Sequence, residues 1–127
     1  MTDTPGSREA AKKTYGYIDS LTKEAHRDVS ADFNQKHKGI GFNKVPEMLA
    51  QTTIDWFSKR DKNVRLSHDA TSEAKNGTVR MTFKGEMKGS SFKMRLDASF
   101  SVSGQAPEAP SYLKDLNFAV DSRDFMS

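Results

Sequence analysis

Two glycine-containing turns on either side of one alternating strand constrain the fold of this chain more than any other feature. Asn76-Gly77 separates the alternating residues 64–71 from the strand that starts at Thr78, and Gly89-Ser90 precedes a third alternating run that ends at Val102. Asn-Gly is the strongest short hairpin signal, because a type I′ turn needs positive φ at both central residues. The two turns therefore predict three consecutive antiparallel strands.

Both turns direct the same residues of the shared strand to one face of the sheet. A turn at Asn76-Gly77 places His68 opposite Gly85, and a turn at Gly89-Ser90 places Phe83 opposite Leu96. Since a slip of one residue inverts the face of a strand, this agreement indicates which face is apolar. The other pairs expected on the apolar face are Ala70–Phe83, Leu66–Met87, Met87–Phe92, Met81–Ala98 and Val79–Phe100, and those expected on the outer face are Glu73–Arg80, Asp69–Lys84 and Glu86–Lys93.

Helical patterns precede the strands, and one more strand follows them. An apolar stripe with helical spacing predicts an amphipathic helix from Ser7, as its N-cap, to about His37. A second helix is predicted over about 45–60, with Pro46 in its first turn. A last strand is predicted over about 112–123, after the Pro-containing connection 103–111.

The order of these elements predicts an α+β fold. We expect a flexible terminus over 1–6 and a single domain over 7–127, in which two N-terminal helices pack on a curved four-stranded antiparallel meander. This order resembles the cystatin-like and nuclear-transport-factor-like α+β group. The resemblance implies a cone of curved sheet around the N-terminal helix, and the chain lacks the further helix and strand that many of those domains have.

Residue types exclude several kinds of chemistry. The chain has no Cys, which excludes a disulfide, a thiol nucleophile and a Cys-based zinc site. Its three histidines lack the i, i+4 spacing of a helical metal site. We therefore expect no metal, no cofactor and no catalytic residue. The acidic residues of the first three strands alternate to the outer face, and they are Asp69, Glu73, Glu86 and Asp97.

The net charge of +3 does not form a surface of one sign. Acidic residues are interspersed with the basic ones, and the first three strands direct no aromatic residue outward for base stacking. This pattern disfavours nucleic-acid binding. No run approaches the roughly 18 apolar residues of a membrane span. The polar start of the chain leaves two locations open, the cytoplasm or an exported location after removal of a signal segment.

Gly85 leaves a gap in the apolar face, which raises the question of a ligand pocket. His68 alternates inward opposite that gap, with Met94 next across the sheet, and Tyr15 faces the same interior from the first helix. The methionines of this face are adaptable enough to line an apolar pocket, although they fill a core more often. The ligand-pocket candidates are therefore His68, Tyr15, Gly85 and Met94, and the favoured alternative is that a helix side chain fills the gap.

Two functions are left open by these patterns. The preferred one is a non-catalytic binding or assembly domain with a protein partner, such as an accessory part of a bacterial envelope or secretion complex. Its partner-surface candidates are Lys84, Lys93 and Arg95 on the outer face and Phe125 in an exposed C-terminal tail. The alternative, which the resemblance implies, is a domain that binds a small apolar ligand, or an isomerase- or hydratase-like enzyme, using the interior of the cone.

Overall fold

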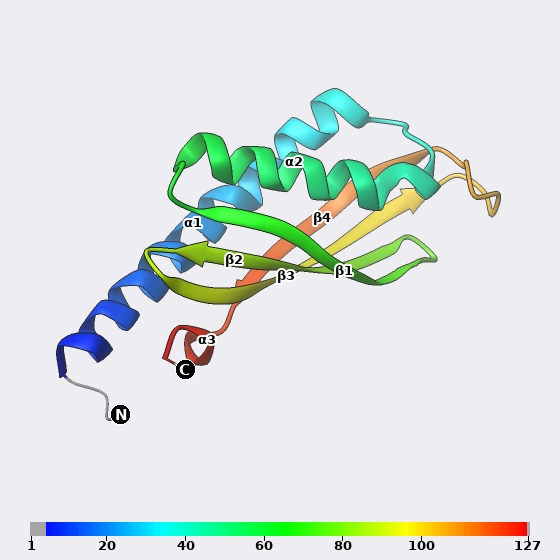
Figure 1. The fold of residues 1–127 in the computed structure, drawn as a ribbon. Coiled ribbons are helices and arrows are strands. Elements are labelled where there is room, and N and C mark those ends of the chain that lie inside the picture. Colours follow the sequence, from blue (N-terminus) through cyan, green and yellow to red (C-terminus); the bar gives the residue numbers. More distant parts are fainter. Residues whose placement is uncertain (1–4, 127) are drawn as a thin grey trace.

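Helices precede an antiparallel sheet in residues 5–126, the part of the chain that the computed structural model describes (Figure 1). The α+β class and the helix–helix–sheet order are those predicted from the sequence. The elements are α1 (Pro5–His37), the 3-10 turn η1 (Phe42–Lys44), α2 (Val45–Arg60), β1 (Arg65–Lys75), β2 (Thr78–Met87), β3 (Ser90–Val102), β4 (Ser111–Val120) and α3 (Ser122–Met126).

The first helix begins earlier than expected. Residues 1–4, which make up most of the expected flexible terminus, lie outside the described residues, as does residue 127. Because α1 already includes Pro5, Ser7 lies within the helix and is not its N-cap. The end of α1 at His37 and both ends of α2 agree with the helical patterns.

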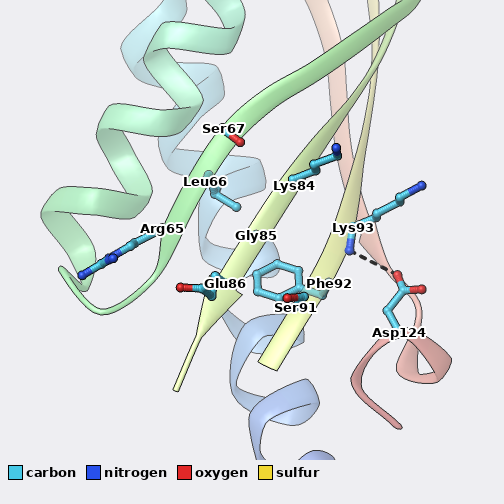
Figure 2. Close-up of a pocket in the computed structure, with 10 residues that line it drawn as sticks. All are labelled: Arg65, Leu66, Ser67, Lys84, Gly85, Glu86, Ser91, Phe92, Lys93 and Asp124. Atoms are coloured by element: carbon cyan, nitrogen blue, oxygen red, sulfur yellow. Dashed lines mark hydrogen bonds between the residues drawn. The ribbon is translucent and has the colours of Figure 1, made fainter. Parts of the chain in front are cut away.

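The two long helices cover one face of the sheet, and in Figure 2 α1 lies behind the strands while α2 lies beside β1. The α1 helix packs mainly on β4, whereas α2 packs on α1 and β1. Their contact residues recur every three or four positions, which places them on one side of each helix. The fully buried positions of α1 are Ile18, Leu21, Ala25, Val29 and Phe33.

The sheet is a meander in the order β1-β2-β3-β4, and its inner face is apolar as predicted. Alternate residues of β2 and β3 are buried, and the intervening residues are mostly exposed. Side chains from both helices and the sheet form one continuous core. Its large members from β2 and β3 are Val79, Met81, Phe83, Met87, Phe92, Met94, Leu96 and Phe100.

The β2–β3 hairpin turns one residue earlier than predicted. The two residues with positive φ are Lys88 (51°) and Gly89 (81°), whereas Gly89-Ser90 was expected. The partners therefore shift by two positions, so that Gly85 pairs with Phe92 and Phe83 pairs with Met94. The expected pairs Met87–Phe92, Phe83–Leu96, Met81–Ala98, Val79–Phe100 and Glu86–Lys93 are wrong, but a shift of two preserves the faces.

The β1–β2 hairpin has the predicted turn but a different register further along. Asn76 and Gly77 both have positive φ, and Glu73 pairs with Arg80 as expected. The register then shifts between Thr71 and Glu73 and again between His68 and Ala70, so that the earlier residues of β1 have other partners on β2 than predicted. Such bulges are typical of edge strands, because an unpaired side of a strand tolerates an extra residue. As a result, His68 pairs with Phe83, Ala70 pairs with Thr82, and Leu66 pairs with Gly85.

The chain leaves the sheet at Val120, before the predicted end of the last strand at about 123. The Asp121 carboxylate accepts a hydrogen bond from the backbone N–H of Arg123 (2.9 Å), which caps the start of α3. It also pairs with the Arg123 guanidinium (2.6 Å), and this side-chain contact lowers the pKa of Asp121 to about 2. The last residues of the described chain thus form a helix, not a continuation of β4.

One edge of the sheet is covered, and the other is bulged. At the β4 edge, the Nδ1–H of His26 on α1 donates to the carbonyl oxygen of Leu116. Ser111 in the same strand exchanges backbone hydrogen bonds with Gly39 and Ile40. At the opposite edge, β1 carries two register shifts and charged side chains, which are known protections against unwanted strand pairing.

The two turn glycines differ in their surroundings, and this difference predicts unequal effects of substitution. A Cβ at Gly77 would lie 2.6 Å from the carbonyl oxygen of Phe100, whereas a Cβ at Gly89 would meet no atom within 4 Å. Both have positive φ, so alanine strains both backbones, by roughly 1 kcal/mol or more. We expect Gly77→Ala to destabilise the fold by about 1–2 kcal/mol more than Gly89→Ala in urea unfolding. Equal losses would contradict the close approach of Phe100 to the turn.

Candidate functional site

The gap over Gly85 is filled from the neighbouring strand. A Cβ on Gly85 would lie 2.3 Å from Cζ of Phe92, its direct cross-strand partner. The Phe92 ring thus lies across the glycine and is only 4% exposed. Placing an aromatic ring over a cross-strand glycine is a known way to stabilise a sheet at such a position. Neither a helix side chain nor a ligand is needed to fill this space.

The Phe92 ring continues into a short stack of aromatic side chains. Phe125 of α3 lies parallel to it, with ring centroids 4.9 Å apart and planes 15° apart. Phe125 in turn contacts Tyr15 of α1 edge to face, at 5.6 Å. The expectation of an exposed Phe125 is wrong, because α3 folds back and buries this ring in the core. We call Phe92, Phe125 and Tyr15 the aromatic stack.

The four ligand-pocket candidates do not surround a common space. Met94 is fully buried and pairs with Phe83 in the core. Tyr15 and Gly85 lie at the two ends of the aromatic stack. His68 is exposed, although its ring lies 5.8 Å from that of Phe83 and its Nε2 lies 3.0 Å from the Thr71 hydroxyl. The bulges of β1 moved His68 away from Gly85.

A hollow of about 580 Å³ lies around Gly85 (Figure 2). Most residues that line it alternate with the buried ones and belong to the outer face, and Leu66, Gly85 and Phe92 contribute its apolar part. We call it the outer hollow. Its lining residues are Arg65, Leu66, Ser67, Lys84, Gly85, Glu86, Ser91, Phe92, Lys93 and Asp124.

Two of the partner-surface candidates meet in the outer hollow. Lys84 of β2 and Lys93 of β3 are direct cross-strand partners. Arg95 lies two residues further along β3, opposite Thr82, and does not line the hollow. Phe125 lies in the core and offers no ring to a partner. The Asp124 carboxylate accepts the backbone N–H of Lys93 (3.2 Å) at the place where β4 has ended.

The outer face changes charge along its length. At the end near Asn76-Gly77, Arg80 lies between two acidic residues, with Glu73 at 3.6 Å and Asp97 at 3.3 Å. At the outer hollow, the Lys84 ammonium lies 3.6 Å from one carboxylate, that of Asp69. Three basic and two acidic residues line the hollow itself. Basic residues therefore outnumber acidic ones in the lining of the hollow, whereas Arg80 has an acidic residue on each side.

The sequence patterns did not identify the rest of the lining. The two bulges bring Arg65 opposite Glu86 and Leu66 opposite Gly85, and no local residue pattern reports where a bulge occurs. Asp124 lies at the hollow because the C-terminal residues fold into the short helix α3. Gly85 was the one visible indication, since it interrupts an otherwise large-residue face.

A hydrogen bond between Tyr17 and Asp61 connects α1 to the residue that follows α2. The Tyr17 hydroxyl donates to the Asp61 carboxylate at 2.6 Å. This hydrogen bond, with the one from the Asn63 N–H, lowers the pKa of Asp61. The same bond and burial raise the pKa of Tyr17. Because it joins residues 44 apart in the chain, the pair holds the two helices together.

Within residues 5–126, no group of three or more His, Asp or Glu side chains is arranged to hold a metal ion. No helix of this region is apolar enough over a sufficient length to cross a bilayer.

The contact of Phe92 with Gly85 predicts a non-additive pair of substitutions. Gly85→Ala forces the ring aside and should destabilise the fold by about 1–3 kcal/mol. Phe92→Ala should cost about 3–5 kcal/mol, because it also removes the surface on which Phe125 packs. In the double variant the added methyl group no longer clashes with the ring. In a urea double-mutant cycle, its loss of stability should therefore be smaller than the sum of the losses of the two single variants. Strict additivity would contradict the contact.

The Tyr17–Asp61 pair predicts a loss of stability in acid. The pKa of Asp61 is lower in the folded than in the unfolded chain, so its stabilisation is complete above the unfolded pKa and disappears as pH falls through the folded one. We expect the urea midpoint of the wild type to fall more between about pH 5 and about pH 2 than that of Asp61→Asn. Tyr17→Phe removes the hydroxyl donor but keeps the hydrogen bond from the Asn63 N–H, so its pH dependence should lie between those of the wild type and Asp61→Asn. Parallel pH profiles for all three proteins would contradict this role.

No protein-family model, no curated protein and no solved structure matches this chain.

Proposed function

We propose that this chain is a non-catalytic binding domain that receives a protein partner at the outer hollow. The observation that carries this proposal is a hollow of about 580 Å³ on an otherwise charged sheet face, with Lys84 and Lys93 directly opposite each other. Polar side chains around an apolar patch are typical of a surface that binds another molecule.

The polar groups at the outer hollow favour binding over catalysis. A catalytic base or nucleophile is activated by burial or by a neighbouring group that orients it. The Lys84 side chain is 67% exposed, and Ser67 and Ser91 are also exposed. Such groups can attract and orient a charged partner without further activation. The hydrogen-bonded pair Tyr17–Asp61 lies outside the lining of the hollow and joins two helices.

The packing of the interior gives no support to the alternative of a ligand in the cone. Phe83, Met94 and Leu96 are all fully buried and belong to one continuous core. The Phe92 ring occupies the gap over Gly85. A ligand at this place would have to displace side chains that already contact one another.

The proposal includes membership of the cystatin-like and nuclear-transport-factor-like α+β group. Its support is architectural: a long N-terminal helix and a second helix on one face of a four-stranded meander. That group includes binding and assembly domains, so a role as an accessory part of a larger complex agrees with the proposed site.

Selection from a random peptide library on the immobilised protein tests the proposal. Selected peptides should shift the backbone amide resonances of residues 84–93 and bind at least about tenfold more weakly to Ser91→Trp, whose indole would occupy the outer hollow. Asn117→Trp is the matched control, because Asn117 is exposed on the same face near the acidic residue Asp97. Failure to select any peptide, or equal binding to both variants, would overturn the proposal.

A further inference from the structure

The two lysines of the outer hollow lie where like charges oppose each other. Lys84 and Lys93 are direct partners across β2 and β3, and like charges at such positions are destabilising. Lys84 has a neighbouring carboxylate on one side, Asp69 at 3.6 Å. Within residues 5–126 the ammonium group of Lys93 has no ion-pair partner, since the contact with Asp124 is made by its backbone. An anion placed between the two lysines would relieve their repulsion.

The opposite end of the same face is arranged differently. Arg80 of β2 is in the third residue pair from the Asn76-Gly77 turn, and its guanidinium lies between the carboxylates of Glu73 and Asp97. Here the sheet supplies an acid on each side of a basic side chain. On the same face, at Lys93 of β3, the described chain forms no ion pair with the ammonium group, because the Asp124 carboxylate contacts the backbone N–H instead. The lining of the outer hollow has three basic and two acidic residues. One added carboxylate would therefore balance its charge.

The form of the outer hollow indicates what carries that carboxylate. It is open on the surface of the sheet, whereas small-molecule sites bury most of the surface of their ligand. A polypeptide segment would cover the opening with its own backbone and flanking side chains. Leu66 and the bare backbone of Gly85 provide apolar surface beside the lysines. An apolar side chain next to the acidic one would therefore have a place to pack.

We infer that the partner binds through an acidic peptide segment that sets one carboxylate between Lys84 and Lys93 and an adjacent apolar side chain over Gly85 and Leu66. This inference rests on the proposed function and states the chemistry of its partner. Single-stranded nucleic acid also carries negative charge, but it needs aromatic side chains for base stacking. The Phe residues of β2 and β3 point into the core, and none lies on the outer face of these strands.

Fluorescence anisotropy with a labelled peptide of alternating Glu and Leu tests the inference. We expect binding that weakens at least about tenfold when Gln replaces Glu, and that also weakens with added salt. Lys93→Glu should reduce the affinity by a similar factor. Lys75→Glu is the matched control, since it makes the same change of charge at an exposed position at the other end of β1.

Each other result overturns the inference in a recognisable way. Equal effects of Lys93→Glu and Lys75→Glu would mean general charge attraction without a site. Absence of Lys93-dependent binding up to roughly 1 mM peptide would exclude the acidic segment. Tighter Lys93-dependent binding of oligo(dT) than of peptide would assign the surface to nucleic acid. If library peptides without acidic residues bind at residues 84–93, the proposed function stands and only the acidic chemistry fails.

Discussion

The contact of the Phe92 ring with the backbone of Gly85 is the interaction on which this end of the molecule depends. It closes the inner face at the one position of β2 that has no side chain. It also presents a flat surface on which Phe125 packs, and Phe125 reaches Tyr15 of the long helix. A single cross-strand contact thus connects the sheet, the C-terminal helix and α1.

The same contact separates the core from the outer hollow. Because the ring covers Gly85 from the inner side, the core remains closed while the opposite side of the strand keeps its lysines exposed. The twisted sheet is a rigid support for these side chains, since β2 pairs with a neighbour along both of its edges. Binding at such a surface requires little ordering of the backbone.

Both edges of the sheet are protected against the addition of another strand. His26 and the segment after α1 occupy hydrogen-bonding groups along β4. On β1, extra residues at Asp69 and Ser72 interrupt the regular ladder that an added strand would need. Both edges are therefore poor templates for strand addition, and the inner face is covered by helices.

Patterns of period two and period three to four predicted most of the fold but not the registers. Alternation assigned the correct residues of β2 and β3 to the core, because an error of two positions leaves every side chain on its face. It misplaced His68 relative to Gly85, because bulges in an edge strand have no simple residue code. It also left Phe125 in an exposed tail, since a five-residue helix is too short to show a period.

By itself, the sequence determined the two long helices and the four strands, the inner and outer faces of β2 and β3, and the position of the first turn. These properties follow from local conformational preference and from the spacing of apolar side chains, which neighbouring residues express directly. Only the tertiary structure decided that Phe92 fills the space over Gly85, that Phe125 packs on it, and that Lys84 meets Lys93. Those contacts join residues from different strands and helices, so they depend on register and packing that no local pattern encodes.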